Sequence, residues 1–204
     1  SEGPLSCVQV ASIPSAQDLN TIMAGFQGWI SQTPPAYSAL KVQGRRAYDL
    51  ARRGNKPRLT PRRVCLHSLV VISYNYPTLV LDVKCSAGTY IRSLARDIGE
   101  KLSTGAYLKR LRRLEIGDFD IAQAVPVERL GEVTPISLEQ ALAAYPRITL
   151  THDDWPRVRN GQSIATSQTF DEQQPVFIWI GDKVVALART QPGFVSSKKL
   201  LAAI

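Results

Sequence analysis

Tyr90 and Arg92 stand where a predicted strand turns into a predicted helix, a position that often forms a binding or catalytic site in proteins. Apolar residues at every second position over residues 79–85 predict a half-buried strand. Apolar residues at helical spacing over residues 91–102 predict an amphipathic helix. An arginine at the positive end of such a helix holds a carboxylate in its charged form, binds a phosphate, or joins a surface salt bridge. The residues alone leave these three uses open.

Other common kinds of site find no support in the sequence. The turn Ser86-Ala87-Gly88-Thr89 lacks the glycine and lysine spacing of a phosphate-binding P-loop, and no Gly-x-Gly-x-x-Gly is present for a dinucleotide. The histidines, His67 and His152, are too few and too scattered for a Ser-His-Asp set or a metal centre.

The cysteines and the paired acids likewise give no indication of a metal site or of catalytic groups. Cys7, Cys65 and Cys85 are odd in number and far apart, so neither a disulfide framework nor a zinc site is indicated. The acid pairs at 153–154 and 171–172 lie outside the basic part of the chain, and we interpret them as solvated loops. We expect no metal.

The positive charge is concentrated in one part of the chain. Residues 41–113 carry 17 Lys and Arg against 4 Asp and Glu, a net charge of +13, whereas the whole chain has +8 and the remainder therefore −5. This asymmetry favours a polyanionic partner, most simply RNA or DNA, over a solvated basic surface without a partner. Tyr37 and Tyr48 are interleaved with the cations and either stack on bases or pack beneath the loop. The candidate RNA contacts are Lys41, Arg45, Arg46, Arg110, Arg112 and Arg113.

Three helices must position these groups. Ser15 and Asp18 have the spacing of a helix start, and Gly28 is the expected end of that helix. Thr89 is the expected N-cap of the helix that carries Arg92. Residues 46–53 predict a short helix closed by glycine. Its expected inward residues are Tyr48, Leu50 and Ala51.

The remaining patterns predict strands and turns. Residues 41–44 suggest a turn or short hairpin, and the β-branched run 64–74 should pair with residues 79–85 as an antiparallel hairpin. Residues 114–121 predict a strand bent at Gly117. Gly181-Asp182 between two apolar runs is typical of a two-residue hairpin.

These elements predict an α+β chain of two domains. Residues 1–145 should form a mixed, largely antiparallel sheet with flanking helices, and residues 146–204 a small all-β module. No apolar run reaches the roughly 18 residues that span a bilayer, and no signal peptide is visible, so we expect a cytoplasmic protein without membrane contact. We also expect a monomer.

Two motif blocks carry a family resemblance. PPAYSALKVQGRRAYDLARRG from Pro34, and CSAGTYIRSLARDIGEKLSTGAYLKRLRR from Cys85, followed by Gly117-Asp118-Phe119, resemble the bacterial tRNA pseudouridine-55 synthase family, TruB, in order and spacing. The resemblance covers nearly all of the chain from Phe26 onward, and the C-terminal module resembles the short PUA-like RNA-binding domain of bacterial members.

The resemblance implies a pseudouridine synthase fold and conversion of uridine to pseudouridine at position 55, in the T-stem-loop of tRNA, without a cofactor. In that family the arginine at the position of Arg92 pairs with the catalytic Asp. The tyrosine at Tyr90 lies against the target base and the Asp, and the leucine at Leu111 lines the uracil pocket.

One part of the family pattern is missing. The nucleophilic Asp of a Gly-x-Leu-Asp-x-x-Ala-x-Gly motif and the base-stacking Tyr have no counterpart in the sequence, and Asp49 belongs to a different block. With Ser1 first, we expect the C-terminal part of a synthase, inactive by itself. The alternative is a non-catalytic RNA-binding protein or tRNA-folding factor. A guide-RNA-dependent synthase is disfavoured because the C-terminal module is short.

Overall fold

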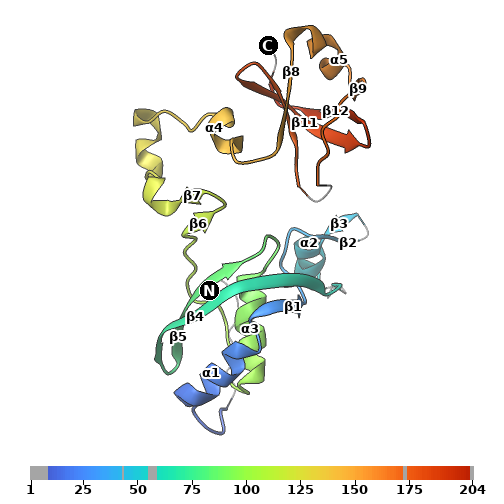
Figure 1. Cartoon of the computed structure of the whole chain (residues 1–204). Helices are drawn as coiled ribbons and strands as arrows, with labels where there is room; N and C mark the ends of the chain where they lie inside the picture. Colours follow the sequence, from blue (N-terminus) through green and yellow to red (C-terminus); the bar gives the residue numbers. More distant parts are fainter. Residues whose placement is uncertain (1–8, 43, 55–58, 172–173, 203–204) are drawn as a thin grey trace. The chain divides into compact units, whose positions relative to one another are not determined.

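The computed structural model describes residues 9–42, 44–54, 59–171 and 174–202. The chain divides into two compact units, Ser1–Phe119 and Asp120–Ile204 (Figure 1). Cys7 and the basic residues Lys56 and Arg58 lie outside the described residues. All candidate site residues belong to the first unit.

The first unit is built on an antiparallel sheet in the order β1-β4-β5. It comprises β1 (Gly28–Gln32), β4 (Arg62–Asn75) and β5 (Thr78–Cys85), so the predicted hairpin of β4 and β5 is confirmed. The helices α1 (Ala16–Ala24) and α3 (Ile91–Lys101) pack on one face of this sheet (Figure 1). The fully buried side chains of that core are Leu19, Met23, Phe26, Leu66, Leu94 and Ile98.

The start of α1 is as predicted and its end is not. Ser15 caps the helix in a capping box with Asp18, and the hydrogen bonds from Ser15 lower the pKa of the Asp18 carboxyl. The expected stop at Gly28 is wrong, since Gly25 is the C-cap. Gly28 instead begins β1 with φ 89°, a left-handed conformation that suits glycine.

The N-cap of α3 is Tyr90, and the prediction of Thr89 is wrong. The Thr89 hydroxyl donates to the carbonyl of Ser86 at 2.8 Å within the turn. The backbone N–H of Tyr90, at the start of α3, instead donates to the side chain of Gln32 at the end of β1.

Residues 41–52, which are rich in Lys and Arg, form a short hairpin followed by a helix. The strands β2 (Lys41–Val42) and β3 (Arg45–Arg46) make the predicted hairpin and lead into α2 (Ala47–Arg52). The expected inward residues Tyr48, Leu50 and Ala51 are only half-buried. Ala47 is the buried residue of α2, and its N–H donates to the carbonyl of Leu40 at 2.7 Å.

After α3 the chain runs without helix or strand from residue 105 to residue 114. The predicted bend at Gly117 separates two short strands, β6 (Glu115–Ile116) and β7 (Phe119–Asp120), which pair with each other. The 3-10 helices η1 (Ile121–Gln123) and η2 (Val127–Glu132) and the helix α4 (Leu138–Leu142) follow.

The second unit contains a five-stranded sheet in the order β8-β10-β11-β12-β9, with β8 and β10 parallel and the other pairs antiparallel. Apolar clusters cover both faces of the sheet. The hairpin at Gly181-Asp182 is confirmed. The all-β expectation is wrong, because η3 (His152–Asp154) and α5 (Trp155–Arg159) lie between β8 and β9. The strands are β8 (Arg147–Leu150), β9 (Ile164–Ala165), β10 (Phe177–Ile180), β11 (Lys183–Gln191) and β12 (Phe194–Leu200).

Within the described ranges, none of the helices has the length and apolar character required to cross a membrane. Those same ranges hold no group of three or more His, Cys, Asp or Glu side chains placed to share a metal ion.

The close approach of residues 103–106 to α3 depends on Gly99. A Cβ atom at Gly99 would lie 2.3 Å from the backbone nitrogen of Ala106 and 2.4 Å from the carbonyl carbon of Gly105. We expect Gly99→Ala to lower the free energy of unfolding by about 1–3 kcal/mol, as overpacking does. Urea denaturation measures this. Gly25→Ala, whose Cβ would come no closer than 3.4 Å to a neighbour, is the control; equal midpoints for the two variants would contradict the prediction.

Candidate functional site

The loop of residues 33–38, which follows β1, is hydrogen-bonded to the first turns of α3. The Ser93 hydroxyl and the Arg96 guanidinium both donate to the carbonyl of Thr33, at 2.8 and 3.0 Å. The Arg92 guanidinium donates to the carbonyl of Tyr37 at 2.8 Å. Side chains of α3 thus bind carbonyls of this loop, and these hydrogen bonds fix the helix start relative to β1.

Gln32 makes the second link between β1 and α3. It is 1% exposed, and its Oε1 accepts the backbone N–H of Tyr90 at 2.8 Å. Its Nε2 is buried and has no hydrogen-bond partner among the residues that the structure describes. Sequence reasoning missed Gln32, although an available signal was a polar residue at an inward position of β1, two residues after the core residue Ile30.

Arg92 is exposed and has no carboxylate partner in the described part of the chain. Its contact with Tyr37 uses one of the five N–H donors of a guanidinium, so the group retains the capacity for a bidentate pair with a carboxylate or phosphate. Arg96, one helical turn further, differs because Asp97 and Glu100 pair with it. Of the two arginines of α3, Arg92 is therefore the one that is open to an anionic ligand.

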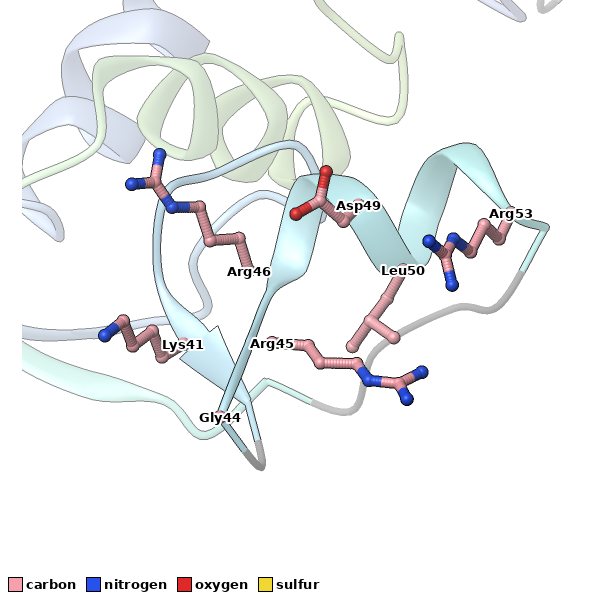
Figure 2. Close-up of a pocket in the computed structure, with 7 residues that line it drawn as sticks. All are labelled: Lys41, Gly44, Arg45, Arg46, Asp49, Leu50 and Arg53. Atoms are coloured by element: carbon pink, nitrogen blue, oxygen red, sulfur yellow. The ribbon is translucent and has the colours of Figure 1, made fainter.

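A basic depression lies over the β2–β3 hairpin and α2. Its volume is about 510 Å³. Figure 2 shows the side chains of Lys41 and Arg46 on one side of the hairpin and those of Arg45 and Arg53 on the other. Asp49 is the one acid among the described lining residues, so the depression favours an anion. The lining residues are Lys41, Gly44, Arg45, Arg46, Asp49, Leu50 and Arg53.

Tyr37 and Tyr48, the two tyrosines close to the basic residues in the sequence, have different environments. Tyr37 is 57% exposed, so the alternative that it packs in the core is wrong. Tyr48 is half-buried, with the guanidinium groups of Arg46 and Arg52 at 5.9 and 5.6 Å from its ring centroid. These cation–π contacts hold the two arginines at the surface of α2.

The structure does not gather every predicted site residue. Leu111 is 61% exposed in the irregular segment before β6, so in this structure its side chain does not line a closed pocket. The cations Arg110, Arg112 and Arg113 are exposed in the same segment. Their roles, like that of Leu111 in a uracil pocket, stay predictions.

Two protein-family models match consecutive parts of the chain. Residues 2–91 match the TruB family pseudouridylate synthase (N terminal domain), and residues 92–145 match the tRNA pseudouridylate synthase B C-terminal domain. The chain is 36% identical to tRNA pseudouridine synthase B of Azoarcus sp. (strain BH72), over 90% of this chain and 63% of that protein. It is 33% identical to tRNA pseudouridine synthase B of Aquifex aeolicus (strain VF5), over 98% of this chain and 69% of that protein.

The chain therefore belongs to the TruB family of pseudouridylate synthases, and it spans about two thirds of the length of these relatives. The resemblance seen in the motif blocks is confirmed.

Solved structures share the fold. A chain in the crystal structure of a Cbf5-Nop10-Gar1 complex matches with a TM-score of 0.66 at 22% identity, over 93% of this chain and 63% of that chain. A chain in the structure of an H/ACA RNP bound to a substrate RNA containing 2'-deoxyuridine matches with a TM-score of 0.65 at 20% identity, over 94% of this chain and 62% of that chain. The expected mixed fold of helices and sheet is confirmed, and a PUA-like character of residues 146–204 stays a prediction.

Ser93 tests the attachment of the 33–38 loop to α3. Its side chain is buried, and Ser93→Ala removes the bond to Thr33 while Arg96 still donates to the same carbonyl. We expect a loss of about 1 kcal/mol in the free energy of unfolding, typical of one hydrogen bond. Urea denaturation measures it beside Ser31→Ala, a change at an exposed residue. If both variants unfold at the wild-type midpoint, the loop does not depend on this bond.

Proposed function

We propose that this chain is the part of a tRNA pseudouridine synthase that carries Arg92, and that the complete enzyme modifies uridine 55 in the T-arm of tRNA. The observation that carries the proposal is the state of Arg92. Its guanidinium is exposed at the start of α3, inside the family segment Gly-Thr-Tyr-Ile-Arg, and it lacks a carboxylate partner among the described residues. A catalytic Asp supplied by the rest of the enzyme would complete that pair.

The reaction exchanges one bond of the uridine for another. The C1′–N1 bond breaks, the uracil turns, and a C1′–C5 bond forms. The hydrogen at C5 then leaves as a proton, and N1 ends protonated, so no atoms or electrons are gained. The target base must leave the stacked loop to be turned, which requires a site that holds the RNA backbone while the base is extruded. The basic depression over β2, β3 and α2 suits that task.

In this mechanism Arg92 holds the carboxylate of the catalytic Asp ionised, and Tyr90 forms a wall against the base. Gln32 supports this role of Tyr90 by accepting its N–H. Leu111 would close the uracil pocket after residues 105–114 fold onto bound RNA. Arg110, Arg112 and Arg113 would contact phosphates, as would Lys41, Arg45 and Arg46.

The sequence contains no Asp in the family's Gly-x-Leu-Asp setting, so this chain alone should bind tRNA without converting it. The same observation favours the second candidate, a non-catalytic RNA-binding protein or tRNA-folding factor. Residues 146–204 would act as a PUA-like RNA-binding module in either case. We further propose that the protein is a cytoplasmic monomer.

Tritium release from C5-labelled uridine in tRNA separates the two candidates when the intact gene product is assayed. A synthase releases tritium, and Arg92→Ala should lower the rate by at least about 100-fold, since the catalytic Asp carboxylate loses its charge partner. Arg129→Ala, which removes an exposed partner of Glu132, is the matched control. Full activity of the Arg92→Ala enzyme would rule out the Arg–carboxylate pair, and no release by the intact product would favour the non-catalytic candidate.

Binding of this chain to tRNA should depend steeply on salt. Each phosphate neutralised contributes about 0.9 to the slope of log K against log[salt]. Replacing both Arg45 and Arg46 by alanine should therefore reduce the slope by about 2. Fluorescence anisotropy with labelled tRNA between low and physiological salt measures it, with Arg129→Ala again as control. An unchanged slope would place the RNA away from this depression.

A further inference from the structure

The face of the β1-β4-β5 sheet that lies opposite α1 and α3 carries an exposed aromatic side chain. Trp29 on β1 is 61% exposed, while its neighbour Ile30 packs in the core with the helices. Since adjacent strand residues point to opposite faces, Trp29 lies on the face away from α3. It is therefore separate from the site around Arg92.

Arg63 lies over the indole of Trp29. β1 and β4 pair with Ser31 opposite Arg63 and Trp29 opposite Cys65, so Arg63 is the diagonal neighbour of Trp29. Its guanidinium carbon is 4.7 Å from the ring centroid. One side of the indole is thus covered by a planar cation, and the exposure of the residue leaves room for a second planar group against the ring.

No acid accompanies this pair on its two strands. β1 and the part of β4 paired with it, residues 62–66, contain no Asp or Glu. Arg62, the strand neighbour of Arg63, is paired with the buried Gln32 and so belongs to the opposite face of the sheet. An aromatic ring bordered by an arginine and without acids beside it matches the chemistry of a nucleotide, whose base stacks beside a cation.

We propose that Trp29 and Arg63 form a stacking site for an unpaired nucleobase of bound RNA, in which the Arg63 guanidinium supplies the positive charge beside the base. The inference rests on the proposed function in one respect, that the partner is RNA. The site adds a contact on the outer face of the sheet, where the RNA is held without reaction. Stacking tolerates any base, so it supplies affinity for single-stranded or looped RNA and little sequence preference.

Tryptophan fluorescence of the intact chain tests the proposal directly. Trp179 is buried at 6% exposure and Trp155 is half-buried, so Trp29 is the exposed indole. Titration with a short oligouridylate, and separately with tRNA, should quench the emission of the wild-type chain. The quenching should be lost in Trp29→Phe, which keeps a stacking ring. Heparin, a polyanion without bases, should bind without this quenching.

Affinity measured by anisotropy separates stacking from charge. Trp29→Leu should bind oligouridylate about tenfold more weakly, Trp29→Phe should retain most of the affinity, and Arg63→Lys should weaken binding although the charge is kept. Val70→Ala is the matched control, because Val70 is 49% exposed and lies between Leu69 and Val71, which pack in the core on the other face. Circular dichroism of each variant shows that it is folded.

Five results would overturn the inference. Wild-type affinity of Trp29→Leu for both RNAs would show that the indole is not a contact, and the proposed tRNA function would stand. Equal quenching by heparin, or equal weakening by Val70→Ala, would show that stacking on Trp29 is not the cause. Self-association in sedimentation that Trp29→Leu abolishes, with no RNA quenching, would identify a protein contact. Failure of the wild-type chain to bind either RNA would remove this inference and the proposed function together.

Discussion

The attachment of α3 to β1 is the constraint on which the candidate site depends. The first turn of a helix leaves backbone N–H groups without partners, and in α3 the N–H of Tyr90 is satisfied by the buried side chain of Gln32. Arg92, Ser93 and Arg96 return hydrogen bonds to the loop that follows Gln32. The helix start and the loop therefore hold each other in place, and Arg92 is presented at the surface by a network that does not include a carboxylate partner for it.

The second constraint is the accumulation of positive charge. Residues 41–113 have a net charge of +13, and most of the described cations there are exposed, where water and salt reduce their mutual repulsion. A few are held by aromatic rings, as Arg46 and Arg52 are by Tyr48 and Arg63 is by Trp29. Such contacts fix cations without neutralising them, so the surface remains available to a polyanion.

Membership of the TruB family is consistent with an Arg92 that has no carboxylate partner among the described residues. The chain spans about two thirds of the length of its relatives. The chain contains Arg92, the hydrogen bond from Tyr90 to Gln32 that positions the start of α3, and basic surfaces. The fold is shared with chains of a Cbf5-Nop10-Gar1 complex and of an H/ACA RNP at 22% and 20% identity, which indicates that the sheet and its helices tolerate wide sequence change.

The sequence by itself determined the local features, because these depend on neighbours along the chain. The β4–β5 hairpin, the capping box at Ser15, the hairpin at Gly181-Asp182 and the basic segment all follow from spacing and residue type. The role of Gln32 could not be predicted in this way. Gln32, and not Thr89, accepts the N–H of Tyr90 at the start of α3, and these two residues are 58 positions apart in the sequence. The same holds for Trp29 and Arg63, which meet through strand pairing, and for Gly99, where the chain returns over the helix. Contacts between distant residues depend on register and packing, which no local pattern contains.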